Sequence, residues 1–182
     1  MKEIRIHGRG GQGNVTAGEL LAVAAFEDGK YSQAFPAFGS ERMGSPVRAF
    51  VRVSDHKIRT RSQVLHPDYV IVQDPSLLAA ENVLEGLKPE GMAIINSEET
   101  PEALDLQTKA QVVTVPAFKI AREVIGRPVP NTVLMGSFAA ATGLVTLEAI
   151  ERSIRHRFRG EIADRNVEAA RKAYQYTNGQ AN

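Results

Sequence analysis

The sequence predicts an α/β fold, a Rossmann-like three-layer sandwich with a mostly parallel sheet, one antiparallel hairpin and C-terminal helices. Strand-like and helix-like segments alternate along residues 2–125, which is typical of parallel strands joined by right-handed crossovers. Tyr69–Gln73 is a continuous apolar, β-branched run, as found in strands covered on both faces. From Thr132 onward the pattern is helical. No linker or repeat interrupts the chain, so residues 1–182 are expected to form a single domain.

The first elements are a strand, a glycine loop and a helix. Lys2–His7 alternates apolar and polar residues, which predicts a strand. Gly8–Gly13 follows as a loop. Asn14–Asp28 is rich in alanine and leucine and predicts a helix, with Asn14 or Thr16 as its N-cap.

The middle of the chain is less regular. Tyr31–Pro46 mixes aromatic residues, prolines, glycines and charges, and we expect a short strand followed by a structured loop. Val47–Val53 and Ile58–Arg61 are β-like runs that predict a hairpin. Asp74 can cap a helix that is expected to continue through Leu87.

The remaining elements follow from short buried runs and helical spacing. The chain end after Tyr176 is expected to fray over Gly179–Asn182. The predicted strands are Met92–Asn96 and Val112–Val115, and the predicted helices are Pro101–Leu106, Ala117–Ile125, 132–143, Thr146–Arg157 and Ala163–Tyr176.

Composition excludes several kinds of chemistry. The 182 residues include no cysteine, which rules out disulfides, a cysteine nucleophile, thiolate zinc sites and protein-ligated iron–sulfur clusters. The four histidines form no metal-ligand pattern, so we expect neither a metal site nor a catalytic residue on this chain. The net charge of +1 favours neither nucleic acid nor a membrane as partner. Without a signal-like or membrane-spanning run, a cytoplasmic location is expected.

The loop after the first strand is the strongest local motif. It satisfies G-x-G-x-x-G between a strand and a helix, where glycine permits close approach and the helix start offers free N–H groups. A phosphate or diphosphate is therefore expected near Gly10–Asn14. An NAD site would also need an acidic residue about 20 positions further on, where Gln33 stands instead. A packing turn without ligand is the alternative. The candidate binding residues here are Gly8, Arg9, Gly10, Gly11, Gln12, Gly13 and Asn14.

Charged residues near this loop extend the candidate site. Arg42 and Arg48 flank the irregular Gly44-Ser45-Pro46 segment and can bind phosphate or a partner's carboxylates. Asp74 follows a predicted strand at its carboxyl end, where it can serve as a ligand or only as a helix cap. His7 ends the first strand and either lines the site or bonds to the backbone.

Four motifs occur in order along the first part of the chain. They are GRGGQG, Glu41-Arg42-x-Gly44-x-Pro46-Val47, Arg59-x-Arg61-Ser62 and Asp68 followed by an apolar strand and Asp74. In order and spacing they resemble the gamma subunit of the 2-oxoacid:ferredoxin oxidoreductases, the pyruvate synthase group. The likeness is strongest over residues 2–80, and the chain length suits the whole subunit.

The resemblance implies a place in a larger enzyme. That enzyme converts a 2-oxoacid, coenzyme A and oxidised ferredoxin to acyl-CoA, CO2 and reduced ferredoxin. Thiamine diphosphate with magnesium lies between its alpha and beta subunits, and 4Fe–4S clusters lie on its beta and delta subunits. Alpha, beta and delta subunits, ferredoxin and coenzyme A are thus the implied partners, with pyruvate as the preferred substrate and anaerobic metabolism as the setting.

For this chain the resemblance implies a non-redox role in assembly and in the coenzyme A site, with the glycine loop contacting the diphosphate or adenosyl part. Three alternatives stay open. The same subunit can serve a 2-oxoisovalerate or 2-oxoglutarate enzyme, the chain can be a stand-alone NAD(P)-binding Rossmann enzyme, or it can be a purely structural scaffold.

Overall fold

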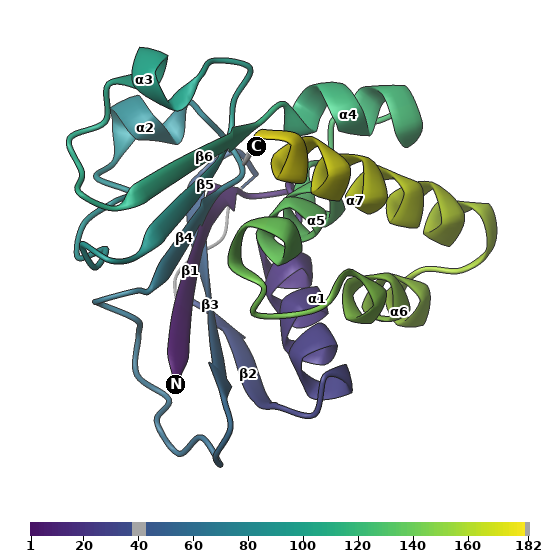
Figure 1. Ribbon diagram of the computed structural model, residues 1–182, viewed down its shortest axis with the longest axis horizontal. Helices are drawn as coiled ribbons and strands as arrows, with labels where there is room; N and C mark the ends of the chain where they lie inside the picture. Colours follow the sequence, from purple (N-terminus) through teal and green to yellow (C-terminus); the bar gives the residue numbers. More distant parts are fainter. Residues whose placement is uncertain (38–42, 181–182) are drawn as a thin grey trace.

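A six-stranded sheet forms the centre of the protein, in the order β2-β3-β1-β4-β5-β6 (Figure 1). The computed structural model describes residues 1–37 and 43–180. The strands are β1 (Lys2–Arg9), β2 (Tyr31–Pro36), β3 (Pro46–Ser54), β4 (Tyr69–Val72), β5 (Met92–Asn96) and β6 (Gln111–Val115). The helices are α1 (Asn14–Glu27), α2 (Leu77–Ala80), α3 (Pro101–Leu104), α4 (Ala117–Val124), α5 (Asn131–Thr142), α6 (Leu147–Arg157) and α7 (Gly160–Gln180).

The mostly parallel sheet is confirmed. Strands β1, β4, β5 and β6 run parallel, and β3 lies antiparallel between β2 and β1. The predicted hairpin is wrong in its second strand, because Ile58–Arg61 is not a strand. The buried guanidinium of Arg52 instead donates to the carbonyl oxygens of Thr60 (3.4 Å) and Ser62 (2.7 Å). These bonds hold the segment away from strand pairing.

One face of the sheet is covered by α1 and by α4 to α7 (Figure 1). Ile4 and Ile6 of β1 point into this layer, together with the alanines and leucines of α1. Helix α5 is buried over most of its length, as its small and apolar sequence predicts. Gly136 lets α7 approach closely, since a Cβ there would lie 2.0 Å from the carbonyl oxygen of Ala170.

The other face carries the short helices α2 and α3 and a smaller apolar cluster around Val70, Val72 and Leu77. The helix predicted to continue through Leu87 is wrong, because α2 ends at Ala80. Residues 83–86 form a turn instead, and the carbonyl oxygens of Val83 and Glu85 accept hydrogen bonds from the Arg5 guanidinium of β1. This tertiary bonding competes with helix formation.

The last helix is longer than its apolar pattern indicates. It begins at Gly160 rather than Ala163 and ends at Gln180. The expected fraying at Gly179 is therefore wrong, and residues 181–182 lie outside the described part of the chain. No helix within residues 1–37 and 43–180 combines the length and apolar character needed to cross a membrane.

Candidate functional site

The glycine loop joins β1 to α1 with backbone conformations that favour glycine. Gly11 has φ +93° and Gly13 has φ +77°, both in the left-handed region. Gly8, still within β1, packs so closely on the Asn14 side chain that a Cβ would lie 2.3 Å from Oδ1. The predicted strand–loop–helix unit is confirmed. At Gly8, Gly11 and Gly13 the backbone geometry or the close packing favours glycine over other residues.

The segment from Met43 to Pro46 lies beside this loop. The Gly10 N–H donates to Ser45 O (2.9 Å), and the Gly44 N–H donates to Gly10 O (3.1 Å). Met43 forms an isolated bridge with Gly10. The irregular segment singled out in the sequence therefore meets the glycine loop, whereas Arg42 itself lies outside the described residues.

The first turn of α1 has no side-chain cap among the described residues. Neither expected cap acts as one, because Gly13 occupies the N-cap position. Asn14 donates instead to Val47 O (3.2 Å) and accepts a hydrogen bond from Gln73. Uncapped first-turn N–H groups attract anions. They border a hollow of about 280 Å³ lined by Arg9, Gly10, Gly11, Gly13, Asn14, Val15, Thr16 and Val47.

The two described candidate arginines are paired with groups of the same chain. Arg9 lines the hollow, and its guanidinium donates to the Ser76 hydroxyl (2.8 and 3.0 Å) and to Gly44 O (3.0 Å). Arg48 lies outside the lining of the hollow, and its Nη2 is 3.4 Å from a carboxylate oxygen of Glu81. Both guanidinium groups therefore already have partners within the chain, and a ligand would have to share or replace these contacts.

Asp74 anchors the glycine loop to the end of β4. Its carboxylate accepts hydrogen bonds from the N–H (3.0 Å) and hydroxyl (2.6 Å) of Ser76 and from Nε2 of Gln12 (2.5 Å). Burial raises the pKa of Asp74, but the bonds from Ser76 and Gln12, with Arg9 nearby, outweigh it and hold the pKa below its ordinary value. The carboxylate thus acts as a fixed acceptor for the loop.

Buried amides connect the carboxyl ends of three parallel strands. Gln73, after β4, donates to Asn14, and Asn96 at the end of β5 donates to Gln73 O (2.8 Å). The Phe118 N–H then donates to Asn96 Oδ1 (3.2 Å). This chain of hydrogen bonds fixes the start of α1, including Asn14 in the lining of the hollow, against the sheet.

His7 is buried beneath the site and does not line the hollow. Its Nε2 accepts a hydrogen bond from Nε of Arg5 (2.9 Å), so the neutral ring carries its proton on Nδ1. Burial, with Arg5 and Arg48, lowers the pKa of His7 to about 3. Glu81 lies 3.9 Å from Nδ1, beyond hydrogen-bond range, and a charged His7–Glu81 pair is inconsistent with that pKa.

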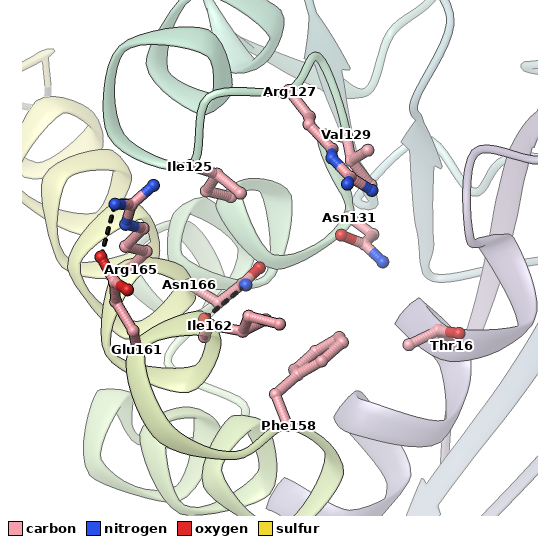
Figure 2. Close-up of a pocket in the computed structure, with 10 residues that line it drawn as sticks. All are labelled: Thr16, Ile125, Arg127, Val129, Asn131, Phe158, Glu161, Ile162, Arg165 and Asn166. Atoms are coloured by element: carbon pink, nitrogen blue, oxygen red, sulfur yellow. Dashed lines mark hydrogen bonds and ion pairs between the residues drawn. The ribbon is translucent and has the colours of Figure 1, made fainter.

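A second and larger hollow, of about 460 Å³, lies on the helical face of the same glycine loop (Figure 2). We call it the helix-side pocket. Thr16 lines both hollows. Sequence reasoning missed this pocket, because its other walls come from residues 125–131 and 158–166. It is lined by Thr16, Ile125, Arg127, Val129, Asn131, Phe158, Glu161, Ile162, Arg165 and Asn166.

The comparisons with known proteins decide the family. The family model for pyruvate ferredoxin/flavodoxin oxidoreductase matches residues 3–176. The chain belongs to this family. Pyruvate synthase subunit PorC of Methanosarcina barkeri is 61% identical over 85% of both chains. The common gamma subunit of the pyruvate/ketoisovalerate oxidoreductases of Pyrococcus furiosus is 49% identical over 97% of both.

Two solved structures share the fold of this chain. The pyruvate oxidoreductase subunit PORC of Thermotoga maritima matches with a TM-score of 0.85 and 40% identity, over 96% of this chain and 95% of that one. The 2-oxoglutarate:ferredoxin oxidoreductase of Magnetococcus marinus, solved with 2-oxoglutarate, coenzyme A and succinyl-CoA bound, shares the fold. Its TM-score is 0.81 at 18% identity, over 98% of this chain and 31% of that one.

Membership of the family confirms the main functional prediction. The chain is a gamma-type subunit of a multi-subunit pyruvate or 2-oxoacid:ferredoxin oxidoreductase. Within the described residues, no group of three or more histidine, aspartate or glutamate side chains is placed to hold a metal ion.

Proposed function

We propose that this gamma subunit, acting as one domain over residues 1–182, contributes the glycine-loop hollow to the coenzyme A site of a pyruvate:ferredoxin oxidoreductase. The observation that carries the proposal is the uncapped first turn of α1 beside two left-handed glycines. Backbone N–H groups at a helix start bind phosphate, and glycine lets a diphosphate approach the backbone closely.

The residues of the loop have different roles in this proposal. Gly8, Gly10, Gly11 and Gly13 shape the loop, and Asn14 fixes the helix start through Val47 and Gln73. Gln12 is the residue through which Asp74 holds the loop. Arg9 is the positively charged residue among the described residues that line the hollow. Arg42 and Arg48 stay predicted contacts to ligand or to a neighbouring subunit.

The reaction chemistry belongs to other chains of the complex. Thiamine diphosphate with magnesium supplies the electron sink for decarboxylation of the 2-oxoacid. A chain without cysteine lacks thiolate ligands for 4Fe–4S clusters, and we place these cofactors on the alpha, beta and delta subunits. The two electrons pass to ferredoxin. This subunit binds and orients the thiol substrate that accepts the acyl group.

Pyruvate is the proposed 2-oxoacid. Relatives that match along most of the chain are called pyruvate synthase subunits, whereas the Pyrococcus furiosus relative is shared by pyruvate and ketoisovalerate enzymes. Purifying the native complex and measuring coenzyme A-dependent viologen reduction with pyruvate, 2-oxoisovalerate and 2-oxoglutarate tests this. Pyruvate is expected to give the highest kcat/KM, and a higher value for another acid would reassign the substrate.

A glycine substitution tests the loop itself. In Gly11→Ala the alanine would have to keep φ +93°, in the left-handed region, and this backbone strain is expected to shift the loop. The new Cβ would also lie 2.9 Å from Cε of Met43, whose exposed side chain can move aside. We expect the assembled complex to show a KM for coenzyme A raised about tenfold or more, a loss of about 1.4 kcal/mol in binding, with the KM for pyruvate unchanged.

Gly29→Ala is the matched control. Gly29 has the same left-handed conformation, with φ +77°, but lies after α1 with open space around it. Backbone strain alone would therefore affect both variants alike. An assembled Gly11→Ala complex with an unchanged KM for coenzyme A would contradict the binding role of the loop and leave it a packing turn.

A further inference from the structure

The connection between β3 and β4 carries a group of exposed positive charges. Figure 1 shows this connection at the end of the sheet that carries the N-terminus, whereas the glycine loop follows the other end of β1. We call residues 55–66 the cationic segment. Its sequence is DHKIRTRSQVLH, so three cationic residues stand within five positions. We propose that this segment docks on a carboxylate-bearing surface of a neighbouring subunit of the oxidoreductase.

The three cations have no partner within the described residues. Lys57, Arg59 and Arg61 are exposed, and no carboxylate of residues 1–37 or 43–180 forms an ion pair with them. The helical layer differs, because four exposed arginines there each lie within 3.0 Å of a carboxylate oxygen: Arg152, Arg155, Arg165 and Arg171. The positive charge of the cationic segment is therefore available to another molecule.

Two buried arginines hold the backbone of the segment, although it forms neither a strand nor a helix. Arg52 is 1% exposed and donates to Thr60 O (3.4 Å) and Ser62 O (2.7 Å). Arg5 is 5% exposed and donates to Val64 O (3.5 Å). Burying a guanidinium is costly unless its N–H groups find acceptors, and these carbonyl oxygens supply them. The cations thus project from a fixed backbone, which lowers the entropic cost of binding a partner.

The character of this surface favours a protein partner. Neither hollow described above is lined by a residue of the segment, so it offers a small ligand no enclosure there. Leu65 is 66% exposed in the same segment, and it adds apolar contact area to the arginines that protein interfaces favour. The net charge of +1 gives no long-range attraction for nucleic acid. Carboxylates bind guanidinium groups in bidentate pairs, so an acidic surface of a neighbouring subunit fits best.

A zero-length carbodiimide cross-link tests the contact in the purified native complex. The reagent joins a lysine amine directly to a carboxylate and does not react with a guanidinium. We expect a cross-linked peptide between Lys57 and an aspartate or glutamate of another subunit. It should disappear in Lys57→Arg, which keeps the charge, and persist in Lys109→Arg, an exposed control before β6. Cross-links of Lys57 confined to this chain, or none at all, would overturn the inference.

Charge reversal measures the contribution of the two arginines. Arg59→Glu/Arg61→Glu is co-expressed with the other subunits, and we expect the yield of complexes containing this subunit to fall about tenfold or more at low salt, because like charges then face each other. Arg59→Lys/Arg61→Lys keeps the charge and should assemble. Lys119→Glu/Arg122→Glu reverses two exposed cations on α4 and is the matched control for net charge. Thermal unfolding of each purified subunit, followed by circular dichroism, verifies folding.

The outcomes separate docking from other causes. Loss of assembly in Arg59→Glu/Arg61→Glu with an unchanged Tm supports the inference, whereas full assembly of that variant overturns it. Equal loss in the α4 control would make net charge the cause and also overturn it. If Arg59→Glu/Arg61→Glu does not fold, the Lys57 cross-link decides. The inference is independent of the coenzyme A proposal, so an unchanged KM for coenzyme A in Gly11→Ala would leave it standing.

Discussion

His7 should make this subunit lose stability in mild acid. The side chain is 1% exposed, and its Nε2 lone pair is occupied by the Arg5 guanidinium at 2.9 Å. Protonating the ring would break that bond and place a second positive charge beside Arg5. These facts explain the lowering of its pKa from 6.5 to about 3, for which burial is the largest cause.

The sign and size of the effect follow from linkage. Between pH 6.5 and 3 the unfolded chain binds a proton at His7 and the folded chain does not, so stability rises with pH in this window and falls as pH falls. Each pH unit below 6.5 lowers the free energy of unfolding by about 1.4 kcal/mol, so a fall to pH 4 lowers it by about 3 kcal/mol.

His7→Gln removes the titration while its Oε1 can still accept from Arg5. We expect the variant to be less stable than the wild type at pH 7, because it loses packing, but to approach or exceed it at pH 4. Urea unfolding followed by circular dichroism at several pH values measures this difference. Other groups titrate equally in both proteins, so the difference isolates His7.

His56→Gln replaces an exposed histidine after β3 in the same way and serves as the control for the substitution itself. The reasoning would be refuted by a stability difference between wild type and His7→Gln that stays constant from pH 4 to 6.5.

Two further predictions concern packing and loop anchoring. Gly136→Ala should lower the free energy of unfolding by about 2 kcal/mol, because overpacking of about 1–3 kcal/mol exceeds any gain in helix propensity; the new Cβ would lie 2.0 Å from the Ala170 carbonyl oxygen. Gly179→Ala, with nothing within 4 Å of its Cβ, should be neutral or stabilising, and urea unfolding compares the two. Asp74→Ala should release Gln12 and Ser76, lower stability by about 1 kcal/mol and raise the KM for coenzyme A of the assembled complex severalfold. Equal KM values would show that loop anchoring does not affect binding.

Local patterns explain why so much of the fold was predictable. The unit from Lys2 to Glu27 follows from a period-2 strand, a glycine run and an alanine-rich helix, each encoded within a few residues. The apolar strands β4 and β5 were predicted for the same reason. The errors fall where distant groups intervene: Arg5 bonds the carbonyls after α2, and Arg52 bonds those after β3.

The candidate site likewise has some features that local sequence predicts and others that depend on contacts between distant residues. By itself the sequence determined the glycine loop, the absence of cysteine and a resemblance that identifies the family, because these depend on residue identity and close spacing. Only the tertiary structure decided that Asn131 lies beside Gly13 and that Arg127 and Phe158 border the same pocket. More than 100 positions separate them from the loop in the sequence. Packing of α5 and α6 against α1, and of α7 against α5 and α6, brings them together, and no local periodicity encodes such contacts.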